Sequence, residues 1–364
     1  MRILIFIRSL VGGGAERVTT TLANGLAQEG HQVALFIKDN IVEYDIDEKI
    51  EVFHSSQSSK IGLIRPLASY YKRFKDTKRI IDRFSPDIIV ASYGSNLLQI
   101  LLASSNIPVI ASEHNTFDRF HTIHERFNRF YLNRYCKKVV ALTNYDKAYV
   151  SRKLHNVVVI PNPLSFSPIT DEEFELGFAV RHNILACGRL NAYLVKGLDT
   201  MIECFARIAT KYPNWDLDIA GKGDEQSENY LKDLCAKYNV KDRVHFLGFS
   251  EHIDEIMKDH SIFVLTSRSE GFGMVITEAM SMGCPCISFN LSGPSEIIIN
   301  TIDGYLVESQ NKTALIEAIE SLINNETKRK IFGKRGLVNV NRFSEDIIIK
   351  QWIQLFDSVK KSES

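Results

Sequence analysis

The chain alternates twice between short apolar segments and longer amphipathic ones, and this order constrains its fold more than any other feature. An apolar segment at residues 3–7 is followed by three glycines at residues 12–14. An amphipathic stretch at 15–29 comes next, and then a second apolar segment at 33–37. Strand, glycine-rich turn, helix and strand in this order predict the opening of a parallel sheet covered by helices. Further strands are predicted at residues 87–91, 108–112, 138–142 and 156–160.

A second alternation starts at residues 183–187, after a polar stretch that contains three prolines. Two successive arrays of this kind indicate two α/β domains of Rossmann-like type, at residues 1–168 and 169–344, with a final helix within 345–364. Ligands of such sheets bind beyond the carboxyl ends of the strands, so we expect the functional residues in the loops there. The later strands are predicted at residues 215–220, 243–247, 261–265 and 285–289.

Composition excludes several classes of protein. Hydrophobic residues make up 45% of the 364 and charged residues 24%, which is typical of a globular protein, and no apolar run approaches the roughly 20 residues that span a bilayer. The six cysteines lack the paired spacing of a zinc site, so we expect a reducing, cytoplasmic location. Residues 1–170 carry 22 Lys and Arg against 15 Asp and Glu, although the net charge is zero. This basic half presents either a solvated surface or a face for an anionic partner.

The strongest motif is S-R-S-E-G-F-G-M-V-I-T-E-A, which follows an apolar strand and leads into a predicted helix. Gly271 and Gly273 let the backbone approach a ligand closely, and free amide groups at the helix start form a ready anion site. Glu270 and Glu278 frame this site, and carboxylates accept hydrogen bonds from paired sugar hydroxyls. The residues predicted to line the site between the two acids are Gly271, Phe272, Gly273, Met274 and Val275.

Two further segments stand at the ends of predicted strands. Gly13 and Gly14 belong to the first strand-to-helix turn, where glycine suits close backbone approach to a phosphate or sugar. A dinucleotide fingerprint would need a third glycine where this chain has Arg17, so the turn is weak evidence for NAD. His114 follows the predicted strand at 108–112, and no zinc-binding pattern accompanies it.

These motifs together resemble a known enzyme family. The spacing of Glu270 and Glu278 within S-x-x-E-G-F-G-x-x-x-x-E-A-M-x-x-G-x-P is similar to the signature of family 4 retaining glycosyltransferases, and the likeness runs along essentially the whole chain. The G-G-A-E-R opening resembles bacterial glycan-assembly transferases, including the GalNAc transferases of N-glycan pathways. The resemblance implies a GT-B fold, in which two Rossmann-like domains face each other across a cleft. It also implies that the first domain binds the acceptor, that the second binds a nucleotide sugar, and that the final helix returns to the first domain.

The resemblance also implies roles for single residues. Glu270 would hold hydroxyls of the donor hexose, and Glu278 would hold the nucleotide ribose. Arg189 and Lys196, in matching G-R-L and K-G segments, would hold the donor diphosphate, and two fixed cations there can stabilise the leaving group without a metal or another cofactor. His114, in the matching S-E-H segment, would contact the donor sugar and the reacting region, which makes His114, Arg189, Lys196 and Glu270 the expected catalytic residues. The remaining donor contacts are expected from Gly13, Gly14, Gly221 and Phe249.

The reaction implied is transfer of a hexose or N-acetylhexosamine from a nucleoside-diphosphate sugar, by analogy UDP-linked, to a glycan or polyprenyl-diphosphate-linked acceptor, with retention at the anomeric carbon. Two other classes stay open. A non-hydrolysing UDP-sugar epimerase of the same fold would use carboxylates as acid and base and would convert a nucleotide sugar without an acceptor. A binding module without turnover would have no need of the diphosphate cations beside both acids.

Residues 65–83 and 119–138 concentrate basic and aromatic side chains in predicted helices. Such helices suit an anionic membrane surface, which would make the protein peripheral at the inner membrane face. Solvated helix faces with core aromatics explain the same pattern equally well, and no nucleic-acid recognition motif accompanies it. The residues expected to meet the membrane are Lys72, Arg73, Lys75, Arg126, Arg129 and Arg134, with Phe120 or Phe127 as an apolar contact.

Overall fold

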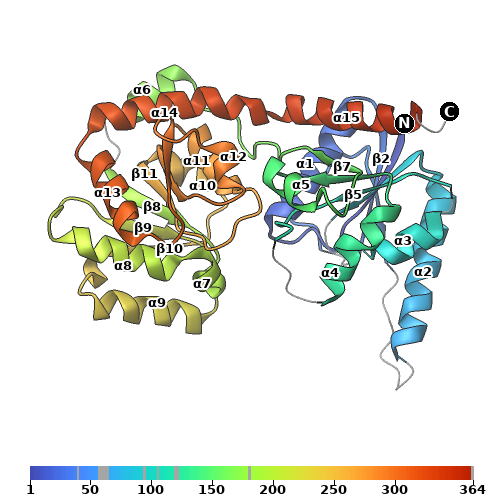
Figure 1. Cartoon of the computed structure of the whole chain (residues 1–364), viewed down its shortest axis with the longest axis horizontal. Coiled ribbons are helices and arrows are strands. Elements are labelled where there is room, and N and C mark those ends of the chain that lie inside the picture. The colour runs from blue at the N-terminus through green and yellow to red at the C-terminus, as the bar shows by residue number, and fades with distance from the viewer. Residues whose placement is uncertain are drawn as a thin grey trace. The chain divides into compact units, whose positions relative to one another are not determined.

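The computed structural model describes residues 1–38, 41–55, 65–92, 96–104, 106–118, 123–178 and 182–361. The chain folds into two compact units (Figure 1). Unit 1 comprises Met1–Ser165 and Phe343–Ser364, and unit 2 comprises Phe166–Arg342. Each contains a parallel sheet with helices on both faces, as the alternation in the sequence predicts.

The sheet of unit 1 has the strand order β3-β2-β1-β4-β5-β6-β7. The order reverses between β1 and β4, and such switch points are where doubly wound sheets bind ligands. Its strands are β1 Arg2–Phe6, β2 Gln32–Ile37, β3 Glu51–His54, β4 Ile88–Ser92, β5 Val109–Ser112, β6 Lys138–Ala141 and β7 Val157–Val159. Its helices are α1 Gly14–Gln28, α2 Arg65–Phe84, α3 Leu97–Ser104, α4 Ile123–Phe130, η1 Leu132–Tyr135, α5 Asn144–Val150 and α15 Glu345–Lys361.

Strand β1 shows how the sequence fills both faces of this sheet. Successive side chains of a strand point to opposite faces. Ile3 and Ile5 accordingly pack with apolar residues of α1 and α15, whereas Leu4 and Phe6 pack with those of α2 and α3. All four are buried, which explains why this strand has a continuous apolar sequence and not an alternating one.

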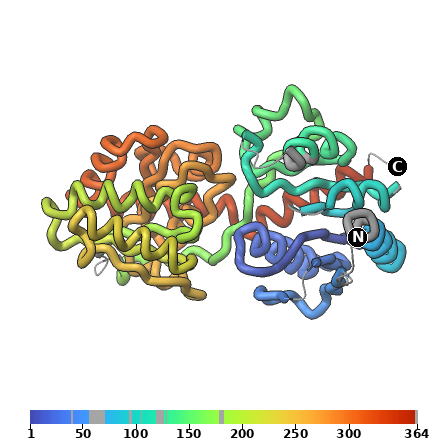
Figure 2. The backbone as a smooth tube through the Cα atoms, turned by 90° about the horizontal axis from the view of Figure 1, so that it is seen from below, coloured from blue at the N-terminus to red at the C-terminus, as the bar shows by residue number. Residues whose placement is uncertain are grey.

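Helix α15 returns to unit 1 after the chain has completed unit 2, and it lies against α1 (Figure 2). Ile349, Trp352 and Phe356 of this helix are buried in the core of unit 1. Gly25 of α1 permits the close contact, because a Cβ atom there would lie 2.7 Å from the Ile349 side chain. Burial of each large apolar side chain contributes roughly 1.5–3 kcal/mol, so α15 is an integral part of this core.

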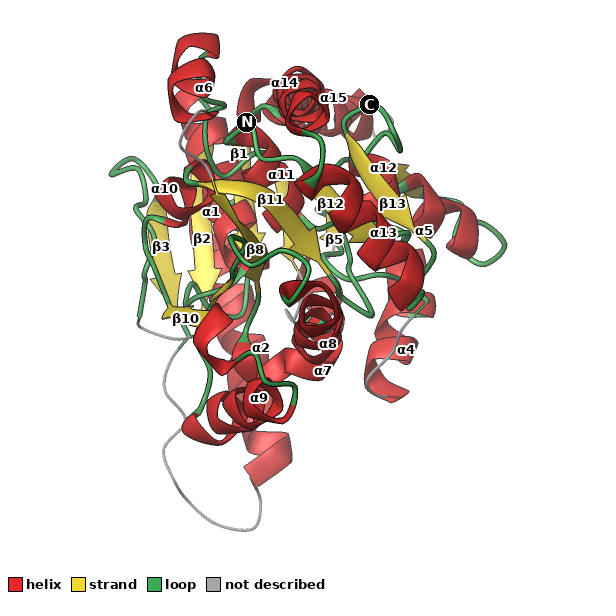
Figure 3. Ribbon diagram, turned by 90° about the vertical axis from the view of Figure 1, so that its left-hand side faces the viewer, coloured by secondary structure: helices red, strands yellow, loops and turns green. Residues whose placement is uncertain are grey.

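The sheet of unit 2 has the strand order β10-β9-β8-β11-β12-β13. Helices α8, α9 and α13 cover one face, and α10 and α11 cover the other (Figure 3). Its strands are β8 His182–Cys187, β9 Leu217–Ala220, β10 Val244–Gly248, β11 His260–Leu265, β12 Cys286–Phe289 and β13 Gly304–Val307. Its helices are α6 Asp171–Phe178, η2 Leu190–Ala192, α7 Tyr193–Lys196, α8 Leu198–Ala209, α9 Glu225–Lys237, η3 Lys241–Arg243, α10 Ile253–Lys258, α11 Met274–Ser281, α12 Pro294–Ile297, α13 Lys312–Ile323 and α14 Glu326–Val340, and η4 Asn341–Phe343 leads back to unit 1.

Two strands of the structure, β3 and β13, are absent from the sequence prediction. Each has four residues and forms the edge of its sheet. β3 has only two apolar residues and β13 has three after Gly304, so neither shows the longer apolar run that marks the central strands. Among the described helices, none is long and apolar enough to cross a membrane.

Candidate functional site

In unit 2, the predicted site residues lie in the loops that follow four neighbouring strands. Arg189 follows β8, Gly221 follows β9, Phe249 follows β10 and Glu270 follows β11. Carboxyl ends of parallel strands lie at one edge of a sheet, so these loops share that edge. Backbone bonds join them: the Gly221 amide donates to the Gly248 carbonyl (2.8 Å). The structure therefore brings together the residues predicted for the second domain.

Lys196 and Glu270 form an ion pair at this edge, with 2.9 Å between Nζ and Oε2. Both side chains are largely buried, at 23% and 15% exposure. Lys196 ends α7, and the next residue, Gly197, has φ +67° and sits so close to β11 that a Cβ atom would lie 1.8 Å from the Thr266 carbonyl oxygen. Glycine is therefore required at Gly197, and its contact with Thr266 fixes where Lys196 leaves the backbone.

Arg268 braces the two loops that carry this ion pair, and the sequence reasoning missed it. Its Nη1 and Nη2 donate to the Asp199 carboxylate oxygens at 2.8 and 2.7 Å, and Nη2 also donates to the Thr200 hydroxyl at 3.0 Å. Its backbone amide donates to the Val195 carbonyl at 2.8 Å. These bonds tie the Glu270 loop to the residues that flank Lys196 on both sides. The available signal was the position of an arginine two residues before a predicted functional acid.

The start of α11 lies where the glycine-rich motif predicts an anion site. Gly273 precedes the helix with φ +101°, and Phe272 beside it is buried. The amide groups of Met274 and Val275 have no backbone acceptor among the described residues. Unsatisfied amides at a helix N-terminus carry partial positive charge and bind anions. Gly271 completes the loop between these amides and the ion pair.

Glu278, one turn further along α11, is buried at 6% exposure. Its charge acts on Cys187, the last residue of β8: burial, and then the nearby Glu278 carboxylate, raise the pKa of the Cys187 thiol. The second predicted carboxylate thus lies close to the carboxyl end of β8, beside the loop that begins at Gly188. An acid here is suited to accept hydrogen bonds from a diol.

Three further predicted residues lie at the rim of this site. The Arg189 side chain is exposed and makes no hydrogen bond or ion pair with any described residue. Phe249 is 68% exposed, which is unusual for an aromatic side chain and suits a ring that stacks on a ligand. Gly221 has φ +151°, and a Cβ atom there would lie 1.9 Å from the Gly188 carbonyl oxygen. Close backbone packing thus sets the shape of the rim.

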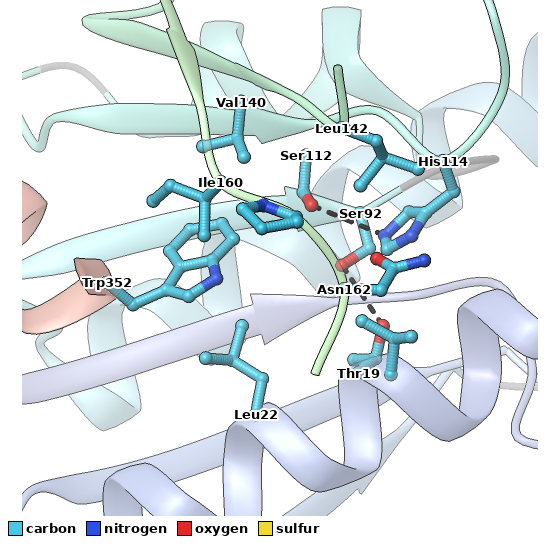
Figure 4. A pocket seen from close by; sticks show the side chains of 12 residues that line it. Thr19, Leu22, Ser92, Ser112, His114, Val140, Leu142, Ile160, Asn162 and Trp352 are labelled. Atoms are coloured by element: carbon cyan, nitrogen blue, oxygen red, sulfur yellow. Dashed lines mark hydrogen bonds between the residues drawn. The ribbon is translucent and has the colours of Figure 1, made fainter. Parts of the chain in front are cut away.

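In unit 1, His114 lines a small cavity at the carboxyl ends of β4 and β5 (Figure 4). Its Nε2 lies 3.3 Å from the Ser112 hydroxyl, and its Nδ1 is buried with no hydrogen-bond partner among the described residues. Thr19 and Ser92 add hydroxyl groups 3.5 Å apart to the same cavity, which has room for about one water molecule. Burial lowers the pKa of His114 to about 4, so the ring is neutral at pH 7.

A buried ion pair fixes the segment that carries His114. The Arg129 Nε lies 3.1 Å from Glu113 Oε2, and its guanidinium donates to the Thr116 carbonyl at 2.6 Å. Asn133 donates to the other oxygen of Glu113 at 2.9 Å. Arg129 is only 5% exposed, so the prediction that it meets an anionic surface is wrong. Helical periodicity placed it among exposed cations, but its charge is neutralised inside the fold.

The other basic residues predicted to meet a membrane differ in their exposure. Lys72, Lys75, Arg126 and Arg134 are exposed, and so are the rings of Phe127, Tyr131 and Tyr135. Arg73 instead lines a cavity, and its Nε is buried without a hydrogen-bond partner in the part of the chain that the structure describes. Phe120 lies outside the described residues.

Gly13 precedes α1 and Gly14 begins it. The Gly13 amide donates to the Tyr44 hydroxyl, and that hydroxyl donates to the Gly13 carbonyl, both at 2.9 Å. The backbone of Gly13 is thus held from the side by a tyrosine that sequence reasoning missed. Among the described residues, no group of three or more His, Cys, Asp or Glu side chains is placed to hold a metal ion.

The two Rossmann-like parallel sheets, one in each unit, are those of the GT-B fold. The chain belongs to the family described as glycosyl transferases group 1, whose model matches residues 170–362. A second model, described as Glycosyltransferase Family 4, matches residues 12–167.

Relatives cover almost the full chain. A glycosyltransferase of Haemophilus influenzae named as uncharacterized is 27% identical over 93% of this chain and 95% of its own length. The amylovoran biosynthesis glycosyltransferase AmsD of Erwinia amylovora is 28% identical over 96% and 98%. An α-1,4-N-acetyl-D-galactosaminyltransferase of Campylobacter jejuni, named for a diNAcBac-PP-undecaprenol-linked glycan, is 27% identical over the whole of both chains.

Solved structures share the fold. Sucrose-phosphate synthase of Thermosynechococcus elongatus matches with a TM-score of 0.84 at 20% identity, over 99% of both chains. HepE of Anabaena, in complex with UDP, matches with a TM-score of 0.78 at 20% identity, over 98% of this chain and all of that one.

Proposed function

We propose that this glycosyltransferase moves a hexose or N-acetylhexosamine from a UDP-sugar to a glycan or polyprenyl-diphosphate-linked acceptor, with retention at the anomeric carbon and without a metal. The observation that carries the proposal is the Lys196–Glu270 pair beside the free amides of α11. Cation, carboxylate and helix N-terminus at one sheet edge are the groups that a sugar diphosphate needs. The UDP complex of HepE and the name of the Campylobacter relative support the donor and the acceptor.

Each group of the site has a proposed task. The amides of Met274 and Val275 bind donor phosphate oxygens, and Arg189 and Lys196 add charge-assisted bonds to the same diphosphate. As the bond between the sugar and the diphosphate breaks, negative charge grows on the leaving oxygen, and these fixed positive groups stabilise it. Electrostatic stabilisation of this kind is available without any metal ion.

The sugar and the nucleoside meet other residues. Glu270 accepts hydrogen bonds from sugar hydroxyls, and Glu278 accepts them from the ribose. Phe249 offers an exposed ring beside the base. For His114 we propose contact with the donor sugar, through a neutral ring whose Nδ1 has no hydrogen-bond partner among the residues that the structure describes. The acceptor hydroxyl attacks the face that the diphosphate leaves, and the departing phosphate oxygen takes its proton, so no protein nucleophile is needed.

The donor class is tested by thermal unfolding of the protein with UDP-, GDP- and ADP-sugars. A ligand at 100 times its dissociation constant adds about 2.7 kcal/mol of stability, which raises the midpoint measurably. UDP-sugars should stabilise and the others should not. Stabilisation by a GDP- or ADP-sugar alone would contradict the donor, and conversion of the UDP-sugar without an acceptor would contradict the transfer reaction.

We also propose that unit 1 contacts an anionic membrane surface. Phe127, Tyr131 and Tyr135 are 49%, 55% and 76% exposed, and Arg126 and Arg134 lie among them. Exposed aromatic rings with cations suit the headgroup region of a bilayer, where each Lys or Arg contributes about 1 kcal/mol. Sedimentation with liposomes should increase with the fraction of anionic lipid and decrease with salt. Equal binding to neutral and anionic liposomes would contradict the proposal.

A further inference from the structure

Unit 1 has a second cavity, away from His114, at the carboxyl ends of its first three strands. Arg8 follows β1, Lys38 follows β2 and Ser55 follows β3, and all three line the cavity. Backbone bonds hold these strand ends together: the Lys38 amide donates to the Arg8 carbonyl at 3.1 Å, and the Ser55 amide donates to the Ile37 carbonyl at 2.9 Å. Helix α2 closes one side with Arg73 and Thr77.

Three cations therefore converge on one cavity, and none of the described residues that line it is acidic. Arg8, Lys38 and Arg73 make no hydrogen bond or ion pair through their side chains with the described part of the chain. The acid nearest in sequence on α2, Asp76, is paired with Arg79 at 3.0 Å. Like charges gathered without a counter-charge repel each other, so this arrangement gains stability when an anion enters.

Arg73 gives the strongest sign that this cavity is suited to an anion. Its Nε is buried and has no acceptor within the described ranges of the chain. A buried donor that loses its partner costs roughly 1–3 kcal/mol, and more when the group is charged. Such a group is rarely left unsatisfied in a folded protein without a functional reason. An anion seated between Arg73 and the strand ends would supply the acceptor.

We propose that this cavity binds the phosphate or diphosphate group of the acceptor substrate. One guanidinium group can donate two parallel hydrogen bonds to two phosphate oxygens. The charge of two arginines and a lysine matches that of a diphosphate better than that of a single carboxylate. Ser55 and Thr77 add hydroxyl donors. Only the identification of the ligand as an acceptor rests on the proposed function; the cavity's preference for phosphate does not.

Calorimetry with inorganic pyrophosphate tests the site. The background is the full chain with Arg189→Ala and Lys196→Ala, which removes the two cations of the proposed donor site in unit 2. This protein should bind pyrophosphate in a salt-sensitive manner, because the three cations remain. Adding Arg8→Ala and Lys38→Ala, both at exposed positions, should weaken binding at least tenfold, and Arg73→Gln should do the same.

Two lysines of unit 1 serve as matched controls. Lys78→Ala removes an exposed cation from the same helix as Arg73, and Lys49→Ala removes one from a loop. Both should leave the affinity for pyrophosphate within twofold. Absence of binding to the background protein, or equal loss in the control variants, would overturn the proposal.

A second experiment identifies the source of the phosphate. Farnesyl diphosphate and vesicles that contain phosphatidylglycerol are compared as ligands of the same variants. Arg8→Ala with Lys38→Ala should weaken binding of farnesyl diphosphate and leave vesicle binding unchanged; the reverse result would assign the cavity to a lipid headgroup and contradict the acceptor proposal. In transfer assays the same variants should raise KM for a diphosphate-linked acceptor and leave KM for the donor unchanged. Failure of UDP-sugar transfer would count against the proposed function and not against phosphate binding.

Discussion

The ammonium group of Lys196 lies 2.9 Å from the carboxylate of Glu270. The residue proposed to bind the donor diphosphate is thus paired with the residue proposed to bind the donor sugar. With these proposed roles, a complete nucleotide sugar would offer both residues new partners. A nucleoside diphosphate alone would attract Lys196 and leave Glu270 without its cation. We therefore expect the ion pair to favour the substrate over the nucleoside diphosphate that remains after transfer, because a partly buried charge that loses its partner is destabilising.

Glu270→Gln tests this exchange. The variant should bind UDP several-fold more tightly than the wild type, since Lys196 no longer has to leave a carboxylate. Transfer should fall by roughly a hundredfold, the scale of losing a group that acts in the transition state. Calorimetry with UDP measures the change in affinity, and initial rates with a UDP-sugar measure the loss of transfer. Glu317→Gln, at an exposed position of α13, is the control and should change neither. Weaker UDP binding in Glu270→Gln would contradict the exchange.

Arg268→Lys should lower kcat/KM for the donor by roughly tenfold or more, although the charge is kept. Lysine cannot reproduce the two parallel bonds to Asp199, so the loop that carries Lys196 loses its brace. Steady-state kinetics on Arg268→Lys, Asp199→Asn and the double variant measure the coupling. The double variant should be no worse than the more impaired single one. Independent, additive losses would show that the brace does not act as a unit.

Arg129→Ala should destabilise unit 1 by about 3–5 kcal/mol, because it leaves the largely buried Glu113 without its cation. Arg126→Ala, on the same helix but exposed, should change stability by less than about 0.5 kcal/mol. Urea unfolding followed by circular dichroism compares the two. Similar midpoints for both variants would show that the Arg129–Glu113 pair contributes little to the folded state.

His114 should make the protein less stable in acid. Its pKa is lowered from 6.5 to about 4 in the folded state, so between these values only the unfolded chain takes up the proton. The stability that the neutral ring contributes is complete above pH 6.5 and is lost as the pH falls toward 4, by about 3 kcal/mol in all. Urea unfolding of the wild type and of His114→Gln at pH 7.5 and 4.5 measures this difference. A wild type that loses no more stability than the variant would contradict the buried neutral ring.

The sequence predicted the central strands and the glycine-rich loops because each has a local signature. Residues 261–265 read as a buried strand from their apolar run alone, and Gly273 marks a turn by its position before a helix. The brace of Arg268 could not be found this way, since Asp199 lies 69 residues earlier and only the pairing of β8 with β11 brings them together. The prediction for Arg129 was wrong for the same reason. Periodicity predicts which face of a helix a residue lies on, but not that Glu113 would pair with it.

Two further features needed the assembled sheet. Arg8, Lys38 and Arg73 are scattered among ordinary charged residues in the sequence, and they gather only because β1, β2 and α2 meet at one corner of unit 1. The edge strand β3 contains Glu51 and His54 beside two apolar residues, a composition that fits a loop equally well. Long-range pairing, and not local propensity, decides such cases.

The central claim is tested most directly by incubating the protein with a UDP-sugar and a polyprenyl-diphosphate-linked acceptor in EDTA, and determining the anomeric configuration of the product by NMR. We expect a glycosidic bond with the configuration of the donor, formed by the wild type and formed at least about a hundredfold more slowly by Arg189→Ala or Lys196→Ala. An inverted product, transfer that requires added magnesium or manganese, or full activity in both variants would contradict the account.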